Sequence, residues 1–170
     1  MANSLASYLA AVKESLNSVL NLRNFPSETV EKHNKPYVET NESSDLKLNN
    51  LNITRTEYDH CFIEPSINSV RVSFAINQSL EIEKCIVHMY QKFLSLRADK
   101  LELFRKKPIS GYDFTFLITN DHLETMHKEY IINFILLFMQ DIEKEISDMK
   151  IELISQLRVC SSFFVNAIAN

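Results

Sequence analysis

The sequence predicts a domain of the α+β class, in which helical segments at both ends of the chain enclose a region of short strands. Apolar residues recur every three or four positions near the N-terminus, around residues 79–96 and over the last fifty residues. In the middle of the chain they alternate with polar residues, which is the periodicity of strands. The composition, 45% hydrophobic and 24% charged over 170 residues, suits one globular domain. We therefore expect a single domain over residues 1–170.

The N-terminal part begins with a helix that Asn3 or Ser4 can cap. Its apolar face would consist of Leu5, Leu9, Val12, Leu16, Val19 and Leu20. A second, short helical segment is expected from Pro26 to Pro36, because the residue before a proline avoids the helical region. Between residues 37 and 77 the alternation predicts four short strands, with apolar positions at Leu46, Leu48, 61–63 and 70–76.

The next segment predicts a helix followed by two strands. Ser79 can cap the helix, whose apolar stripe would be Ile82, Ile86, Met89, Phe93 and Leu96. Strands are expected over residues 100–104 and 112–118. The connection between them contains Gly111, the only glycine of the sequence, at a position where a turn often requires a positive φ.

The last fifty residues predict a long helix over residues 121–150, followed by a further helical tail over 151–170. The 121–150 segment contains no proline or glycine. Thirty residues at about 1.5 Å each give a helix of about 45 Å. This length equals or exceeds the width of a compact domain of this size. The helix is therefore expected to extend beyond the body of the domain.

Two apolar stripes run along this helix, and they suggest different roles. The shorter stripe, Leu123, Met126, Tyr130, Phe134 and Leu137, is expected to cover the chain's own sheet. The longer stripe has spacings of 4, 3, 4, 4, 3 and 4, and an apolar face that outlasts its domain usually meets a helix of another chain. The alternative is that residues 151–168 fold back onto it. The predicted partner-binding seam consists of Ile131, Ile135, Phe138, Ile142, Ile146, Met149 and Leu153.

The sequence offers no support for enzyme chemistry or for a cofactor. A single glycine excludes phosphate-binding glycine loops, and a net charge of −4 argues against a nucleic-acid partner. The three cysteines form no CxxC pair. His122 and His127 are five positions apart, about 140° around a helix axis, so they cannot bind one metal ion together, and no metal site is expected. The longest apolar run, nine residues over 131–139, is too short to cross a membrane, and the N-terminus does not resemble a secretory signal.

Four long segments of the sequence resemble one known family. They are residues 30–36 (VEKHNKP), 66–73 (SINSVRVS), 107–120 (KPISGYDFTFLITN) and 143–150 (EKEISDMK). In sequence and order they are similar to subunit 4, the small scaffold subunit, of the actin-related protein 2/3 complex. The resemblance runs collinearly from about residue 8 to residue 158, which is nearly the whole chain.

The resemblance implies a fold, a set of partners and a location. It implies an antiparallel sheet and a long C-terminal helix that pairs antiparallel with the larger scaffold subunit. The heterodimer would hold the actin-related proteins, join the other subunits and lie on the mother actin filament, supporting nucleation of branched filaments. The location would be the cytoplasm and actin cytoskeleton, in the cortex and cell projections. The alternative function is that of a small α+β trafficking adaptor or a secretion-chaperone-like dimer.

Basic residues are the expected contacts with the filament, because actin has an acidic surface. The candidates are Arg55, Arg105, Lys106, Lys107 and Arg158. For the cluster at 105–107 the alternative is a solvated hairpin tip without a binding role.

Overall fold

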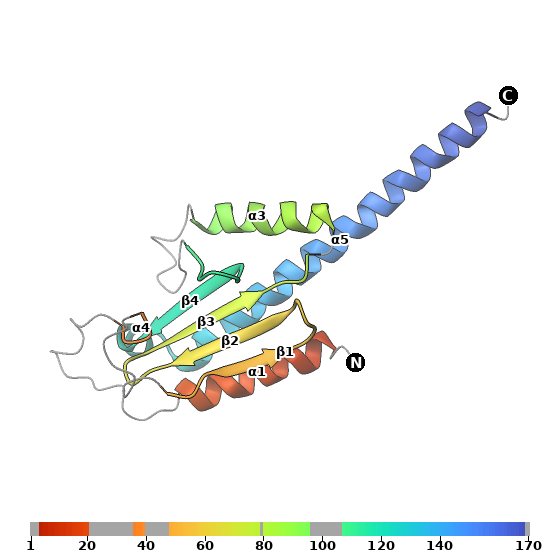
Figure 1. The fold of residues 1–170 in the computed structure, drawn as a ribbon. Helices are drawn as coiled ribbons and strands as arrows, with labels where there is room; N and C mark the ends of the chain where they lie inside the picture. Colours follow the sequence, from red (N-terminus) through yellow and green to blue (C-terminus); the bar gives the residue numbers. More distant parts are fainter. Residues whose placement is uncertain (1–3, 21–35, 40–47, 79, 96–106, 169–170) are drawn as a thin grey trace.

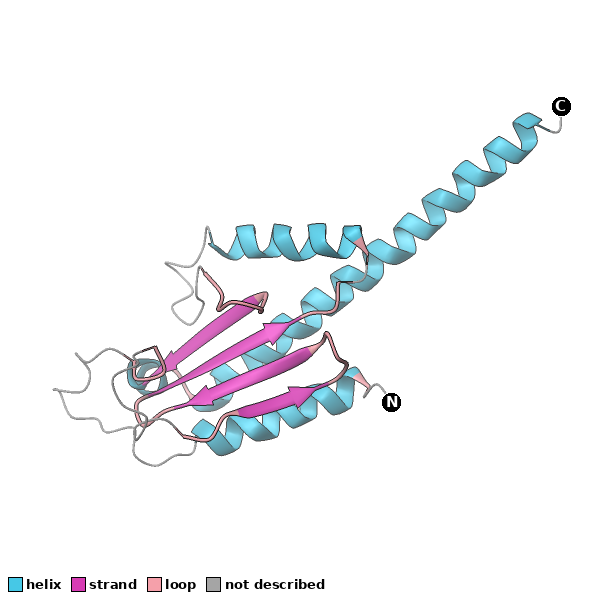
Figure 2. Ribbon diagram, in the orientation of Figure 1, coloured by secondary structure: helices cyan, strands magenta, loops and turns pink. Residues whose placement is uncertain are grey.

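The computed structural model describes residues 4–20, 36–39, 48–78, 80–95 and 107–168, and it confirms the α+β class. Four antiparallel strands form one sheet in the order β1-β2-β3-β4. Two helices, α1 and α5, lie side by side across one face of this sheet, and α5 continues far beyond it (Figure 1). Figure 2 separates the helical and strand layers. The elements are α1 (Leu5–Leu20), β1 (Leu51–Thr54), β2 (His60–Pro65), β3 (Ser69–Ala75), α3 (Glu81–Ser95), β4 (Phe114–Thr119), α4 (Asn120–Thr125) and α5 (Lys128–Ile168).

The core lies between the sheet and the two helices that cover it. Residues paired across the strands, such as Cys61 with Phe74 and Val72 with Phe116, share one face because side chains alternate along a strand. This face meets α1 and α5. Strands β2, β3 and β4 contribute fully or almost fully buried side chains to it: Cys61, Ile63, Val70, Val72, Phe74, Phe114, Phe116 and Ile118.

Helix α1 agrees with the sequence prediction in both its start and its apolar face. The Ser4 hydroxyl accepts a hydrogen bond from the Ser7 backbone N–H at 3.2 Å, which satisfies one of the free donors of the first turn. Five of the six predicted apolar residues are buried, and Leu5 packs at the edge of the core. Tyr8 is buried as well, although the prediction did not include it.

Helix α3 exists as predicted, but the face that it turns toward the body differs in part from the predicted stripe. Of that stripe, the side chains of Ile82, Phe93 and Leu96 lie outside the described residues. Met89, which the predicted stripe includes, is 67% exposed. Ile86 of the predicted stripe is buried, and so are Glu83 and Val87, which the stripe omits. The side-chain amide of Gln91 donates to the Asp113 carbonyl at 2.8 Å. The prediction is wrong for Met89 because it assumed that every buried position of α3 is apolar, whereas the Glu83 carboxylate takes part in the packing.

The predicted helix over 121–150 and separate tail over 151–170 are not the segments that the structure forms. A short helix, α4, ends at Thr125, Met126 has extended backbone, and α5 then runs without a break to Ile168. The Thr125 hydroxyl donates to the Asp121 carbonyl at 2.7 Å. Such local side-chain bonds compete with helical ones, and this explains an interruption without proline or glycine.

The strands partly match the predicted positions. Those at 61–63, 70–76 and 112–118 correspond to β2, β3 and β4. The alternation also predicts a strand at Leu48, whereas β1 begins three residues later. Residues 26–35 of the predicted helix and the strand positions at Leu46 and 100–104 lie outside the described residues. Gly111 has the expected positive φ, 86°.

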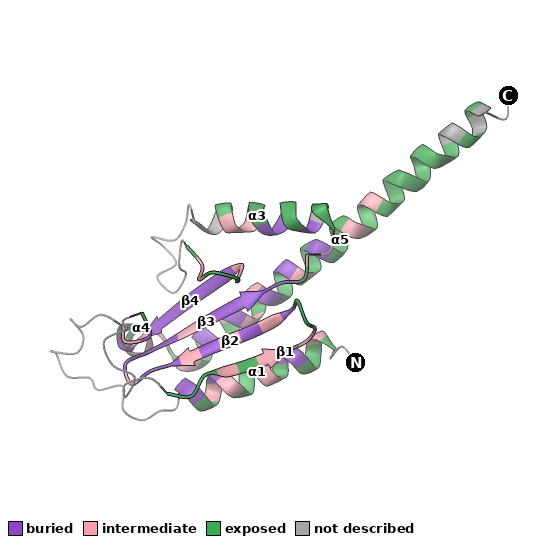
Figure 3. Ribbon diagram, viewed as in Figure 1, coloured by how far each residue is buried: buried purple, intermediate pink, exposed green. Residues whose placement is uncertain are grey.

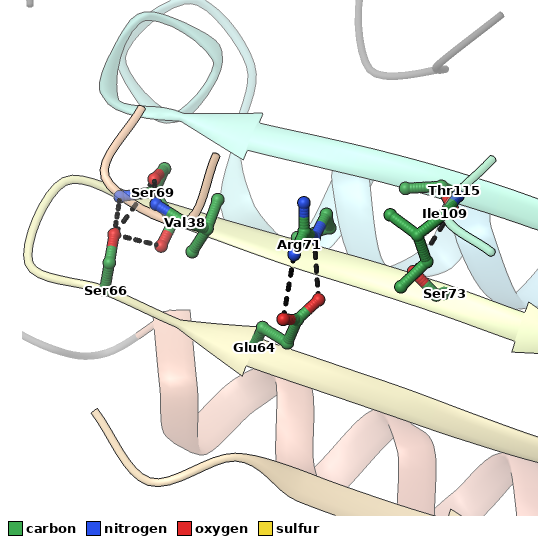
Figure 4. A network of polar contacts seen from close by, with 8 residues as sticks. All are labelled: Val38, Glu64, Ser66, Ser69, Arg71, Ser73, Ile109 and Thr115. Atoms are coloured by element: carbon green, nitrogen blue, oxygen red, sulfur yellow. Dashed lines mark hydrogen bonds and ion pairs between the residues drawn. The ribbon is translucent and has the colours of Figure 1, made fainter. Parts of the chain in front are cut away.

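Polar contacts hold the sheet face that is turned away from the core (Figure 4). Arg71 on β3 donates two hydrogen bonds to the Glu64 carboxylate on β2, at 2.6 and 2.8 Å. The Ser66 hydroxyl accepts from the Ser69 N–H at 3.0 Å in the turn between these strands. The Thr115 hydroxyl lies 3.1 Å from that of Ser73. Because these contacts join neighbouring strands, we assign them a structural role.

Candidate functional site: the apolar surface of the C-terminal helix

The first half of α5 belongs to the hydrophobic core of the chain, which contradicts part of the predicted partner-binding seam. Ile131, Ile135 and Ile142 are 0% exposed, and Ile146 is 6% exposed. Phe138 packs edge-on against Phe114 and Phe116 of β4, with ring centroids 5.1 and 5.2 Å apart. These five seam residues therefore pack into or against the core of their own chain, with Phe138 half-buried.

The shorter predicted stripe lies only partly on the outside: Leu123, Met126 and Phe134 pack against the core as predicted, whereas its other two residues are exposed. Tyr130 is 62% exposed and Leu137 is 58% exposed, while Phe134 packs at the edge of the core. Periodicity identified both stripes but contained no information about which of them the sheet would cover. The interruption at Met126 adds to the error, because residues before and after it do not share one continuous helix.

The second half of α5 extends away from the body, and its side chains are largely exposed (Figure 3). We call residues 149–168 the projecting segment. Met149 is 36% exposed and Leu153 is half-buried, so the last two seam residues lie here. Further apolar residues, which the predicted seam omitted, are more exposed: Ile151 67%, Ile154 50%, Leu157 60%, Val159 54% and Val165 64%.

One face of the projecting segment continues the face that covers the sheet. Met149, Leu153, Leu157 and Cys160 follow one another at spacings of 4, 4 and 3, which keeps them on one side of a helix. The signal that could have identified Leu157 is this same spacing carried one turn further. Soluble monomers rarely expose a contiguous apolar surface of this kind, so this face is the candidate binding site.

An ion pair anchors α5 close to the start of the projecting segment. The Lys150 ammonium contacts the carboxylate of Glu83 on α3. The Glu83 side chain is only 2% exposed, and it also accepts a hydrogen bond from the Leu80 N–H at 2.9 Å. A buried carboxylate needs such partners because water no longer solvates it. The pair therefore fixes α3 against α5 near the end of the body.

A second polar cluster fixes α5 to the turn between β1 and β2, and it includes Arg55. The Arg55 guanidinium lies 3.0 Å from the Asp59 carboxylate and 2.7 Å from that of Glu143 on α5. Burial and the nearby Glu143 raise the pKa of Asp59, although the Arg55 charge opposes this. Arg55 was predicted as a filament contact, but two carboxylates of its own chain neutralise its charge.

The other basic candidates are in different positions. Lys107 is exposed before β4, and Arg158 is exposed on the projecting segment. One precedes a strand of the body and the other belongs to the segment that extends away from it, so the structure does not bring them together. Arg105 and Lys106 lie outside the described residues.

Side chains with chemical reactivity are not gathered into a site in the described part of the chain. No group of three or more histidine, cysteine, aspartate or glutamate residues there is arranged to hold a metal ion. Burial raises the pKa of the Cys61 thiol, which keeps this core residue protonated. Among the described helices, none combines the length and apolar character that crossing a membrane requires.

Comparison with known proteins gives matches over nearly the whole chain. A model of the family described as "ARP2/3 complex 20 kDa subunit (ARPC4)" matches residues 1–167. The "probable actin-related protein 2/3 complex subunit 4" of Caenorhabditis elegans is 45% identical over 97% of this chain and 98% of its own length. Subunit 4 of Saccharomyces cerevisiae is 43% identical over 98% of each chain. That of Dictyostelium discoideum is 39% identical over 99% of this chain and 100% of its own. The chain therefore belongs to the family of the ARP2/3 complex 20 kDa subunit.

Proposed function

We propose that this chain is a non-enzymatic structural subunit of the actin-related protein 2/3 complex. In this role it forms the core heterodimer with the larger scaffold subunit and supports nucleation of branched actin filaments. Family membership over residues 1–167 supports this function over a trafficking adaptor or a secretion-chaperone-like dimer. The cytoplasmic actin cytoskeleton is the corresponding location. One structural observation carries the proposal: an apolar helix face that continues beyond the body.

The apolar face of the projecting segment is the proposed contact with the larger scaffold subunit. Leu157 and Leu153 lie one turn apart on this face, followed by Cys160. Removing apolar surface from water contributes about 25 cal/mol per Å², and the chain itself provides nothing to cover these side chains within its described part. A helix suits such a face, because its own backbone hydrogen bonds are already made. The family resemblance implies that the two helices run antiparallel.

Co-expression with the larger scaffold subunit tests this contact. Leu157→Asp places a charge on the proposed interface, whereas Leu157 is 60% exposed in the isolated chain. We expect co-purification to fall by tenfold or more, because a buried unpaired charge is costly. Ser155→Asp is the matched control, because Ser155 is exposed on the same helix but points about 160° away from Leu157 around the helix axis. Equal co-purification of the two variants would exclude this face as the contact.

The filament contact is a separate part of the proposal, and it rests on exposed positive charge. Lys107 and Arg158 are the described candidates, and Arg105 and Lys106 remain candidates from the sequence. Lys107→Glu should weaken cosedimentation of the assembled complex with filaments by about two- to fivefold at low salt. The difference should shrink as salt is added, because exposed charges are screened. Lys144→Glu makes the same charge change elsewhere on the surface, and an equal effect of both would contradict a specific role for Lys107.

A further inference from the structure

Two buried oxygen atoms have no hydrogen-bond partner among the residues that the structure describes. They are the hydroxyl oxygen of Tyr8 on α1 and the carboxylate oxygen Oδ1 of Asp59, which directly precedes β2. The two residues are only 2% and 3% exposed. Buried polar atoms in proteins nearly always have a partner, which is either a protein group or an ordered water molecule. The partner of these two atoms therefore has to be identified.

The two atoms belong to one polar cluster. Helix α1 packs against β1, and its first turns lie at the end of the sheet where β1 leads into β2 (Figure 1). The pKa of Tyr8 is raised, first by burial and then by the nearby Cys61 and Asp59. Asp59 and Cys61 are two positions apart, so the alternation along a strand directs both side chains to the same face. That face is the one that α1 covers, and the Tyr8 hydroxyl therefore approaches Asp59 from the helix side.

One of the two atoms donates and the other accepts. The raised pKa of Tyr8 keeps its hydroxyl protonated, so this group has an O–H to donate. The other oxygen of Asp59, Oδ2, accepts from Arg55 at 3.0 Å. An ionised carboxylate paired in this way offers Oδ1 as an acceptor only. A molecule that binds between the two atoms must therefore accept from Tyr8 and donate to Asp59.

A water molecule meets both requirements. A direct bond between the two side chains is not formed, and both side chains are fixed. Tyr8 packs in the hydrophobic core, while the turn holds Asp59 through N–H groups of Arg55 and Thr56 that donate to its carbonyl at 2.9 and 3.1 Å. The positive charge of Arg55 on the same carboxylate disfavours a metal ion. Leaving both atoms unpaired costs more than ordering one water molecule.

We propose that an ordered, buried water molecule binds between the Tyr8 hydroxyl and Oδ1 of Asp59. It links α1 to the turn between β1 and β2. Because Arg55 also contacts Glu143 at 2.7 Å, the same chain of polar contacts continues to α5. The site lies within one chain, so the inference goes beyond the proposed function and does not depend on it.

A crystal structure of the full chain, alone or in the assembled complex, tests the proposal at a resolution that shows ordered water. We expect one water molecule at about 2.6–3.2 Å from both the Tyr8 hydroxyl oxygen and Asp59 Oδ1. A direct hydrogen bond between Tyr8 and Asp59 would overturn the proposal. So would a protein group bonded to either atom in place of the water, or the lack of electron density between them.

Tyr8→Phe tests whether the hydroxyl holds the water. This variant keeps the aromatic ring in the core, and the occupancy of the water should fall by about twofold or more because one of its partners is lost. Ser18→Ala is the matched control, since it removes an exposed hydroxyl from the same helix and should leave the water in place. Unchanged occupancy in Tyr8→Phe would overturn the proposal.

Hydrogen exchange in solution provides a second measurement. The Arg55 and Thr56 amides donate to the Asp59 carbonyl, so their exchange reports how often this turn opens. In Tyr8→Phe, a peptide that covers residues 55–59 should exchange faster by about threefold or more, whereas Ser18→Ala should match the unmodified chain. Equal exchange in Tyr8→Phe and the unmodified chain would contradict a link from α1 to this turn.

Discussion

The two halves of α5 have similar periodicity but opposite environments. In the half that covers the sheet, Ile131, Ile135 and Ile142 are fully buried. In the projecting segment, Ile151 and Leu157 are 67% and 60% exposed. One helix therefore contributes to the core of its own chain over its first turns and presents an unoccupied apolar face over its last ones.

An apolar stripe in the sequence identifies one face of a helix but not what covers it. In α5 the chain's own sheet covers this face only as far as the sheet extends. Burial of an isoleucine side chain stabilises a fold by about 1.5–3 kcal/mol, and only the body half gains this within the chain. Most of the stability of a helix in a protein comes from the packing of its amphipathic face. The projecting segment is therefore expected to become more stable when a partner covers it.

The largest expected effect comes from the same substitution in the two halves. Ile142→Asp buries an unpaired charge and loses apolar burial, so the free energy of unfolding should fall by about 3–5 kcal/mol. The corresponding decrease in melting temperature is about 10 °C or more. Leu157→Asp should leave thermal unfolding of the isolated chain nearly unchanged. Similar melting temperatures for the two variants would contradict the conclusion that only the first half of α5 belongs to the core.

A smaller effect is expected where the two halves meet. Lys150→Ala leaves the buried Glu83 carboxylate without its cation, and urea unfolding should show a loss of about 1–3 kcal/mol. The partial exposure of Lys150 reduces this effect through solvent screening. Lys144→Ala, at an exposed position of the same helix, is the control. Adding Glu83→Gln to Lys150→Ala should recover part of the loss, and no recovery would argue against a role for the ion pair.

The smallest effect concerns the cluster that ties the body half to the β1–β2 turn. The pKa of Asp59 is raised from 3.8, first by burial and then by Glu143. Between 3.8 and the raised pKa, the folded chain binds more protons than the unfolded chain, so stability from this group decreases as pH rises. Asp59→Asn should therefore weaken the pH dependence of the unfolding free energy between these two pKa values. Asp148 is exposed, so Asp148→Asn should leave the change of the unfolding free energy with pH as it is in the unmodified chain. If Asp59→Asn also leaves that pH dependence unchanged, it arises from other groups.

Local patterns in the sequence predicted the elements better than their faces. The spacing from Leu9 to Leu20 predicted both α1 and its buried side, because the residues of this apolar stripe are the ones that the core takes up. In α3, the same reasoning failed at Met89, since the buried Glu83 depends on a lysine 67 residues later in the chain. Arg55 shows the same limit: its partner Glu143 lies 88 positions away, so its charge looked free in the sequence.

The sequence alone determined the helical and strand periods, the α+β class, the likeness to one family and a C-terminal helix too long for its domain. These follow from residue spacing and composition, which act locally along the chain. Only the tertiary structure decided that Ile131 and Ile142 face the sheet, that Tyr130 and Leu137 face outward, and that the unoccupied surface begins near Met149. Which side of a helix is buried depends on the position and length of the sheet beside it, and that is set by contacts between residues far apart in sequence.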